Sequence, residues 1–432
     1  MTSIYPNINA ELFIKNRFKL KKRLLSSSCY FVFSNDEMPR NGDQYFPYRQ
    51  SSDFFYLTGI EQEKSILMVC PHHPNKSLRE VLFILESTPL METWIGHKLT
   101  GEEAKNISGI ENVQYLESFE QLQKDVIQHS EHAYLNIPEI PKFFPDIETR
   151  DIRASREVED NFPLHSFKRL APLLRELRTK KEKEEIEAIQ KACEITGNAF
   201  SRVLNAMRPG VSEKEIEAEI SYEFIKENAG HAYLPIIGSG KNACILHYTE
   251  NNQICKKGDL VLMDFGAEYN NYAADCTRTI PVSGKFSVRQ AEVYDGLHTI
   301  FVKAIKMMEP GRKMDEVHKK VCALMEQFHI DLGLYNSNDA KGNTGKQPLW
   351  FKYYMHGTSH SMGLDVHDVF DKEAVFEPGM IFTCEPGIYI EDENLGIRIE
   401  NDILITEDGN IDLMRHIPSK REEIEKLMTK IL

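Results

Sequence analysis

The stretch VLMDFGAEYNNYAADCTRT, residues 261–279, decides the fold of the second half of the chain. It places two acids, Asp264 and Asp275, inside runs that otherwise read as buried β-strands. An Asn-Asn pair at 270–271 separates the runs and tolerates the positive φ of a tight two-residue turn. With the turn there, opposed residues are symmetric about the pair, so Asp264 faces Thr277 and both acids share one face. A three-residue loop would send the carboxylates to opposite faces.

A second hairpin of the same kind is predicted at MIFTCEPGIYIEDENLGIRIENDILIT, residues 380–406. With a four-residue loop at 391–394, Glu385 lies directly across from Glu400. Two like charges about 5 Å apart repel by about 3 kcal/mol at an effective dielectric constant near 20. Such a pair needs a shared proton, a nearby Arg or Lys, or bound cations.

Bound metal ions are the solution that fits the charge balance of the two hairpins. Arg398 lies two residues from Glu400 on the same strand face, but one cation does not balance four acids. A metal pair fits if the two hairpins face each other, a condition that the sequence pattern alone does not decide. Single acids near strand ends are more often solvated turn residues. Asp264 and Glu385 are hard to explain in that way because each follows an apolar run.

The composition is that of a globular protein with more than one domain. The chain has 432 residues, of which 41% are hydrophobic and 27% charged, and this length exceeds the usual size of one hydrophobic core. The formal net charge of -14 argues against nucleic acid and against an anionic membrane as the main partner. Eight cysteines are scattered singly, which is typical of a reducing compartment, and we expect a cytoplasmic protein without a secretory signal or membrane span.

The pattern of apolar residues changes near residue 172, and we expect an α/β (α+β) protein of two domains, 1–172 and 173–432. Short strand-like runs alternate with charged helical segments in the first domain, at 29–34, 65–70, 80–86 and 132–138. A long charged helix then follows, with apolar residues at three- and four-residue spacing (Ile186, Ile189, Ala192, Ile195 and Ala199). Further helices are predicted after the Ser212–Glu215 capping box, at 288–308 and at 314–329.

Histidines add further candidate site residues. The segment YYMHGTSHSMGLDVHD, residues 353–368, carries His356, His360 and His367. The four-residue spacing of the first two is that of a zinc-protease helix, but a glycine occupies the place of the general-base Glu, and HGTSH is a poor helix. We therefore expect a loop or bulge that points imidazoles into a cavity, and we interpret His247 in GSGKNACILHYTEN in the same way. A further match, MDFGA, lacks every other element of a protein kinase.

The ordered set of five candidate ligands resembles the pita-bread metallopeptidases, which include methionine aminopeptidase, prolidase, Xaa-Pro aminopeptidase and the metal-free creatinase. The resemblance covers residues 173–432 and rests on DFGA, HGTSH, CEPGIYI and RIEND. The segment YRQSSDFFYLTGI, residues 48–60, looks like the creatinase-type N-terminal domain, as found in the Xaa-Pro aminopeptidase branch. The histidine segments also look most like that branch. The resemblance implies the fold: a creatinase-like α/β domain followed by a pita-bread catalytic domain.

The resemblance also implies a site with two divalent ions. The implied ligands are Asp264, Asp275, His360, Glu385 and Glu400, with Asp275 and Glu400 bridging the ions. Ligands of oxygen and imidazole suit Mn(II), Co(II) or Zn(II), and the number of carboxylates favours manganese. The implied roles of other residues are Glu385 as proton shuttle, His247 and His367 near the scissile peptide, His356 in the substrate pocket, and Arg398 as support for the bridging carboxylates. Trp94 is the match to a tryptophan that reaches a neighbouring subunit.

The implied activity is removal of the N-terminal residue from peptides with proline in the second position. The implied assembly is a homo-oligomer, a dimer or a tetramer. The rival hypothesis is a prolidase restricted to Xaa-Pro dipeptides, which would share every ligand. A methionine aminopeptidase would not need the large N-terminal domain. A fold used only for binding, as in relatives that have lost their metals, is disfavoured because all five ligands are present.

Overall fold

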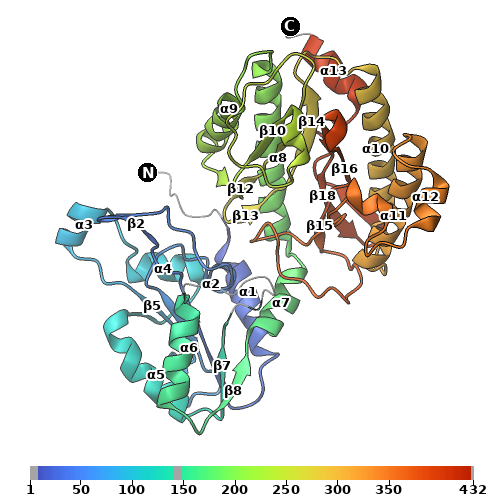
Figure 1. Ribbon diagram of the computed structural model, residues 1–432. Helices are drawn as coiled ribbons and strands as arrows, with labels where there is room; N and C mark the ends of the chain where they lie inside the picture. Colours follow the sequence, from blue (N-terminus) through green and yellow to red (C-terminus); the bar gives the residue numbers. More distant parts are fainter. Residues whose placement is uncertain (1–7, 138, 140–147, 430–432) are drawn as a thin grey trace. The chain divides into compact units, whose positions relative to one another are not determined.

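The computed structural model describes residues 8–137, 139 and 148–429. The chain divides into two compact units, 1–178 and 179–432, which Figure 1 shows in blue to green and in green to red. The expected domain limits, 1–172 and 173–432, stay a prediction. Each unit combines helices and strands, as predicted.

The N-terminal unit is built on a six-stranded mixed sheet with the order β6-β5-β4-β1-β7-β8 among its described residues. The four strand-like runs predicted from the sequence are β1, β4, β5 and β7; Pro138, at the end of the last run, lies outside the described residues. The strands are β1 Ser28–Phe33, β2 Pro39–Asn41, β3 Gln44–Tyr45, β4 Ile66–Val69, β5 Glu80–Ile84, β6 Val113–Tyr115, β7 His132–Leu135 and β8 Ser166–Arg169. The helices are α1 Ala10–Lys21, α2 Ser52–Thr58, α3 Pro89–Ile95, α4 Gly101–Ser108, α5 Phe119–Gln128, α6 Arg150–Asn161 and α7 Ala171–Thr179.

Helix α5 packs on the sheet through aromatic contacts. The ring of Phe119 meets the rings of Phe31, Phe33 and Phe83 edge to face, with centroids 6.3, 6.1 and 5.1 Å apart. The helix also contributes Val126 and Ile127 to the hydrophobic core. The edge-to-face aromatic contacts and the complete burial of Val126 and Ile127 hold α5 firmly against the strands. The side chains on its opposite face are therefore presented from a rigid support.

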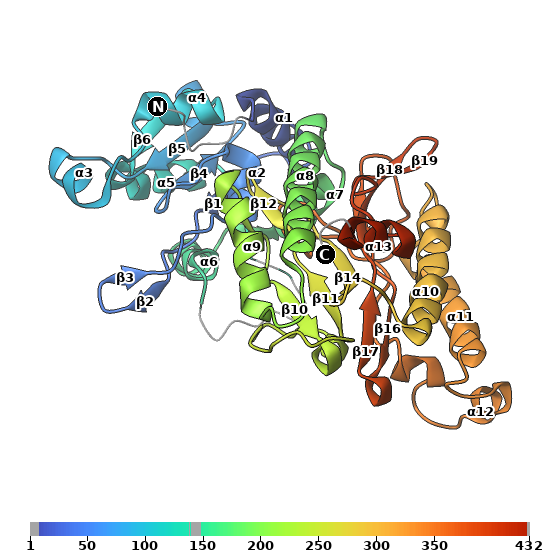
Figure 2. The same cartoon turned by 90° about the horizontal axis from the view of Figure 1, so that it is seen from above.

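Helices flank the strands of the C-terminal unit. Figures 1 and 2 show α8 and α9 on one side of these strands and α10 and α11 on the other. The predicted helix face is confirmed in α8 for four of its five residues, because Ile189, Ala192, Ile195 and Ala199 are buried, whereas Ile186 is half-buried. The predicted capping box at Ser212 and Glu215 begins α9. The helices are α8 Lys183–Ala206, α9 Glu213–Lys226, α10 Val288–Met307, α11 Met314–Asp331, α12 Ser337–Gly342 and α13 Arg421–Thr429.

The strands of the C-terminal unit form several small antiparallel sheets. Their orders are β10-β11-β14, β13-β12-β9, β15-β18-β19 and β16-β17. The strands are β9 Gly230–His231, β10 Ile236–Ser239, β11 Leu260–Asp264, β12 Ala267–Tyr269, β13 Tyr272–Ala273, β14 Thr277–Pro281, β15 Ile381–Cys384, β16 Gly387–Ile390, β17 Leu395–Arg398, β18 Asn401–Thr406 and β19 Gly409–Asp412. Each acid-bearing hairpin therefore consists of two short ladders with a break between them. The predicted acids lie at these breaks.

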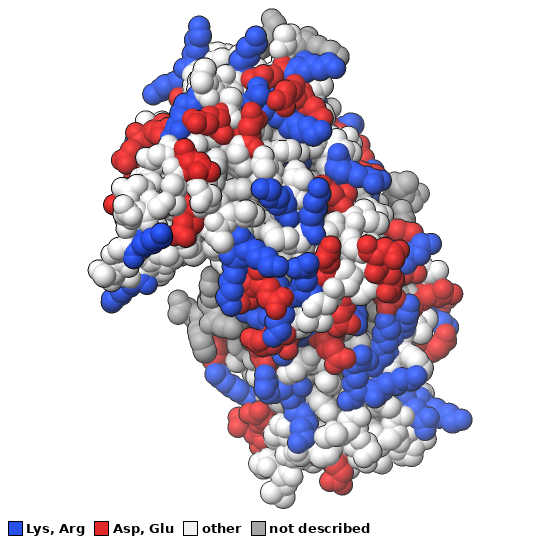
Figure 3. Space-filling view, turned by 90° about the vertical axis from the view of Figure 1, so that its right-hand side faces the viewer, with Lys and Arg blue, Asp and Glu red and all other residues white. Residues whose placement is uncertain are grey.

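The surface carries side chains of both charges. On the face in Figure 3, Lys and Arg side chains are interspersed with Asp and Glu side chains. All eight cysteines lie in described parts of the chain and are free thiols. Among the described helices, none has both the length and the apolar character needed to cross a membrane.

Candidate active site

The first hairpin has the predicted register. Its turn residues, Asn270 and Asn271, have φ angles of 50° and 65°. Tyr269 pairs with Tyr272 beside the turn, and Asp264 pairs with Thr277 at the end of the second ladder. Between the ladders, a Cβ atom on Gly266 would lie 1.7 Å from the carbonyl oxygen of Ala274. The strands thus approach too closely here for any side chain, and glycine is required.

The second hairpin also has the predicted register. Cys384 pairs with Asn401 and Gly387 pairs with Arg398. Glu385 and Glu400 lie between these pairs, directly across from each other. The loop includes Asn394 at a φ of 51°.

The two hairpins face each other, which was the condition that the sequence left open. Thr277 of the first hairpin donates a hydrogen bond from Oγ1 to Oε2 of Glu400, at 2.6 Å. The backbone N–H of Glu400 donates to the carbonyl of Thr277, at 3.1 Å. These contacts bring all four acids to one cavity of about 240 Å³.

All nine residues predicted for the site line this cavity. They are His247, Asp264, Asp275, His356, His360, His367, Glu385, Arg398 and Glu400. Apolar side chains complete the lining, namely Leu234, Ile236, Leu246 and Val366. The structure thus gathers every candidate, while their roles as ligands and catalytic groups stay predictions.

The histidine segment is irregular, as predicted, and no helix covers residues 356–360. The Nε2 atom of His360 lies 3.3 Å from Oδ2 of Asp275 and 3.8 Å from Oε1 of Glu385. Its Nδ1 atom lies 3.2 Å from the carbonyl oxygen of Ser361. Because a carbonyl can only accept, Nδ1 carries the proton and Nε2 faces the carboxylates. The ring of His367 packs edge to face on that of His360, with centroids 4.3 Å apart.

His356 is held on the opposite side of Glu385. Its Nε2 atom lies 2.9 Å from the hydroxyl of Tyr389, and its Nδ1 atom lies 2.8 Å from the carbonyl oxygen of Gly357. The same Nδ1 is 3.6 Å from Oε2 of Glu385. Burial lowers the pKa of His356 to about 3, so this imidazole is neutral.

Arg398 contacts one of the acids directly and reaches another through Thr277, and its supporting role stays a prediction. Its Nη2 atom lies 2.5 Å from Oδ2 of Asp264, one of the implied metal ligands. It reaches Glu400 through Thr277, whose hydroxyl accepts from Nε at 3.0 Å. The reason is the strand register, because Thr277 stands opposite Asp264 and beside Glu400.

Two further polar residues of the site were not predicted from the sequence. The hydroxyl of Tyr233 lies 2.5 Å from Oδ1 of Asp264 and 2.6 Å from Oδ1 of Asp275, so its proton is shared between two acids. Nothing in the pattern of GHAYLPIIG marks this tyrosine. Thr277 could have been found, because the predicted register already places it opposite Asp264.

The site holds more negative charge than its cations balance. Burial raises the pKa of Glu385 to about 7, and burial together with the charges of Asp275 and Glu385 raises that of Glu400 well above its usual value. Burial opposes the protonation of His360, but the hydrogen bond to Asp275 and the charge of Glu385 outweigh it and raise the pKa to about 9. These shifts show carboxylates that attract protons or other cations.

The donor set fits divalent metal ions. One ligand atom each from Asp275, His360 and Glu400 lie within 4.8 Å of one another. Asp264 and Glu385 line the same cavity. Carboxylate oxygens and a neutral imidazole are ligands for Mn(II), Co(II) and Zn(II). Bound cations would also remove the repulsion between the buried acids.

Comparison with known proteins agrees with this chemistry. Residues 187–407 match metallopeptidase family M24, and residues 13–134 match the aminopeptidase P N-terminal domain. The chain is 35% identical to an Escherichia coli protein named Xaa-Pro aminopeptidase, over 98% of each chain. It is 34% identical to the Haemophilus influenzae protein of that name, over 97% of each. A solved structure of zinc-substituted E. coli aminopeptidase P in complex with product superposes with a TM-score of 0.88 at 32% identity, covering 99% of this chain and 100% of that one.

The two matched regions and the full-length relatives agree with the two units of the fold and with the acid-lined cavity. The chain belongs to metallopeptidase family M24, with the N-terminal domain of aminopeptidase P, and is a metal-dependent hydrolase.

Proposed function

We propose that the chain is an Xaa-Pro aminopeptidase, which removes the N-terminal residue from peptides with proline in the second position. The observation that carries the proposal is the convergence of five metal-ligand candidates in one cavity. The full-length similarity to proteins named Xaa-Pro aminopeptidase supports the same activity.

The proposed centre holds two divalent ions, with Mn(II) favoured and Zn(II) or Co(II) as alternatives. Asp264, Asp275, His360, Glu385 and Glu400 would hold the ions, with Asp264 on one, His360 and Glu385 on the other, and Asp275 and Glu400 shared between them. The proximity of Asp275, His360 and Glu400 supports this assignment. When bound, the ions supply an activated water molecule for attack on the peptide carbonyl.

Side chains around the ions carry the other steps. Glu385 lies across from Glu400 and between His356 and His360, where it can hand a proton to the leaving proline nitrogen. His247 and His367 line the same cavity and can donate hydrogen bonds to oxygens of the tetrahedral carbon. His356, neutral and held by Tyr389, lines the substrate pocket.

Selection of proline rests on the apolar part of the cavity. Leu234, Ile236, Leu246 and Val366 offer surface to the proline ring. The nitrogen of an Xaa-Pro peptide bond carries no hydrogen, so an apolar pocket around the proline leaves no N–H group of the substrate without a hydrogen-bond acceptor. The free α-amino group of the substrate would bind near the acids.

The experiment that tests the activity is hydrolysis of matched peptides by the manganese-loaded protein. An Xaa-Pro-Yaa tripeptide should release its first residue at least as fast as the Xaa-Pro dipeptide is split. Asp275→Asn should abolish release, whereas Asp259→Asn, a half-buried acid just before the same hairpin, should leave it unchanged. Cleavage of the dipeptide alone would favour a prolidase.

The proposed assembly is a homo-oligomer, a dimer or a tetramer, in the cytoplasm. Helix α3 exposes large apolar side chains, with Leu90, Trp94 and Ile95 exposed at 69%, 80% and 56%. Such a group supports contact with a neighbouring copy. Free thiols at all eight cysteines support a reducing compartment. Sedimentation of the protein and of Trp94→Ala tests the contact, because the variant should dissociate.

A further inference from the structure

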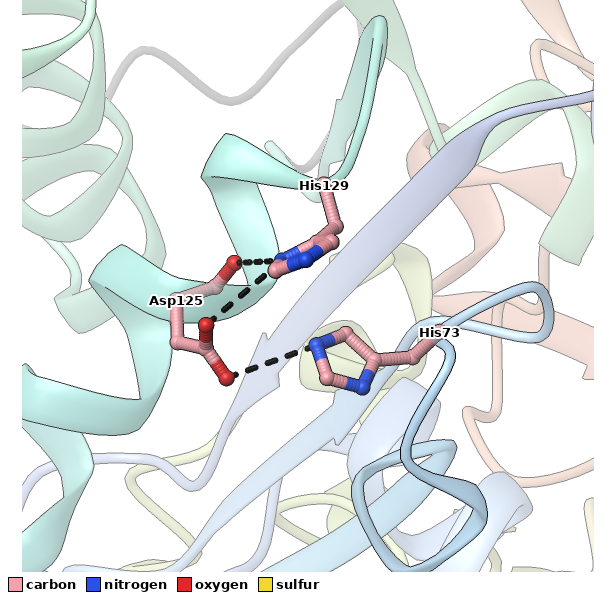
Figure 4. A group of neighbouring side chains, drawn as sticks. All are labelled: His73, Asp125 and His129. Atoms are coloured by element: carbon pink, nitrogen blue, oxygen red, sulfur yellow. Dashed lines mark hydrogen bonds and ion pairs between the residues drawn. The ribbon is translucent and has the colours of Figure 1, made fainter.

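A second group of side chains of the types that can bind metal lies in the N-terminal unit, within residues that play no part in the proposed catalysis. Asp125 lies on α5, and His129 directly follows the helix four residues later, on the same face. His73 comes from the loop after β4. Figure 4 shows the carboxylate of Asp125 beside the two imidazoles, with dashed lines to both. One ligand atom from each residue lies within 4.8 Å of the others.

His73 is buried but has a nitrogen that makes no hydrogen bond. The residue is 2% exposed, and its Nε2 atom has no hydrogen-bond partner. The carboxylate oxygen Oδ2 of Asp125 lies 3.4 Å from this atom, beyond the usual hydrogen-bond distance. Buried polar atoms without partners are rare in proteins and call for an explanation such as an ion.

The tautomers of both histidines favour metal binding. The Nδ1 atom of His73 lies 3.2 Å from the carbonyl oxygen of Asn75, and that of His129 lies 2.8 Å from the carbonyl oxygen of Asp125. A carbonyl only accepts, so in the neutral form of each imidazole the Nδ1 atom carries the proton and the Nε2 atom keeps its lone pair. A backbone carbonyl that orients the far nitrogen in this way is a common outer partner of metal-bound histidine.

The spacing is close to that of a coordination shell. Ligand atoms of a tetrahedral zinc ion, with bonds of about 2.0–2.1 Å, lie about 3.3 Å apart. The separation of 3.4 Å between His73 and Asp125 already matches. The side chains of His129 and Asp125 are each 42% exposed. The His129 side chain can therefore move to complete the set of three protein ligands, and a water molecule can reach the fourth coordination position of the ion.

We infer that His73, Asp125 and His129 form a second metal site, which binds a Zn(II)-class ion with water as fourth ligand. Two imidazoles and one carboxylate, without thiolate, suit Zn(II) among the borderline metals. The ion would tie the loop after β4 to α5. Because α5 is anchored in the core through Phe119, the loop gains a rigid attachment.

The test counts zinc ions bound to the full-length, manganese-loaded protein during a titration with Zn²⁺. Zinc can also exchange into the catalytic centre, but it does so equally in all variants. The difference in the number of bound zinc ions between variants therefore reports on the N-terminal site alone. Asp125→Ala and His129→Ala each remove an exposed ligand on a well-packed helix and should fold. The matched control is His97→Ala, an exposed histidine 2.9 Å from Glu103 that lies outside the site.

Wild type and His97→Ala should bind one more zinc ion than the double variant Asp125→Ala/His129→Ala. Each single variant should weaken the extra ion by about tenfold or more, since even outer partners change affinity about 10–100-fold. Zinc should slow hydrogen exchange of residues 70–79 in wild type and in His97→Ala but not in the double variant, and manganese-dependent peptidase activity should be the same in all variants. Equal zinc uptake by all of them, or loss of activity together with zinc uptake, would overturn the inference.

Discussion

The hydroxyl of Thr277 connects the two hairpins, and its replacement by valine should loosen the site without changing its volume. Thr277 is fully buried; its Oγ1 donates to Glu400 at 2.6 Å and accepts from Nε of Arg398 at 3.0 Å. Hydrogen bonds to charged groups contribute about 1.5–3 kcal/mol each, and a buried partner left unpaired adds to the loss. We expect Thr277→Val to lower the free energy of unfolding of the metal-free protein by about 3 kcal/mol.

The same substitution should weaken metal binding, because Thr277 orients a predicted bridging ligand. Removal of such an outer partner costs about 10–100-fold in affinity. The assay is competition for Mn(II) with a chelator, together with urea unfolding followed by circular dichroism. Thr279→Val is the matched control, since Thr279 is equally buried on the same strand but bonds only to the backbone of Arg398, at 3.2 Å. Equal manganese affinity in the two variants would refute the reasoning.

Three further predictions concern the C-terminal unit. Gly266→Ala should destabilise the first hairpin by at least about 3 kcal/mol, because the new methyl meets a carbonyl of the opposite strand; an unchanged urea midpoint would contradict the close approach. Backbone amides of residues 261–279 should exchange faster without metal than with it, while those of β4 and β5 stay unchanged; equal protection would argue against metal-held acids. Burial lowers the pKa of His329 in the folded protein to about 4. As the pH falls below about 6.5, this histidine takes up a proton in the unfolded state but not in the folded state, so the free energy of unfolding decreases between about pH 6.5 and pH 4. His329→Gln should remove about 3 kcal/mol of that dependence in urea unfolding at each pH, and identical pH profiles would show that His329 is not the group responsible.

The registers of both hairpins could be predicted because side chains alternate along strands and the turn residues are marked. Asn270 and Asn271 adopt the positive φ by which the first turn was placed, and Asn394 in the second loop has a positive φ as well. The packing of one hairpin on the other could not be predicted, because it depends on a contact between Thr277 and Glu400, which lie far apart in sequence. Strands β6 and β8 were missed because they are short, polar and partly exposed at the sheet edges.

Other parts of the sites carried no sequence signal. Tyr233 lies in a segment without periodicity, and only the folded chain shows its hydroxyl between two acids. His73 and Asp125 belong to different elements, so their proximity follows from the packing of α5 on the sheet. Resemblance to a known family supplied the expected metal ligands, which the hairpin registers alone left open.

The central claim is that paired metal ions, held by the acids of the two hairpins, make this chain a peptidase. The most direct measurement titrates Mn(II) into chelator-treated protein and follows both bound ions and release of the first residue from an Xaa-Pro-Yaa peptide. The double variant Asp125→Ala/His129→Ala serves here, so that the N-terminal site adds no ions to the count. We expect no release without metal and a rise that levels off at two ions per chain. Hydrolysis that survives removal of metal, or that is complete at one ion, would contradict it.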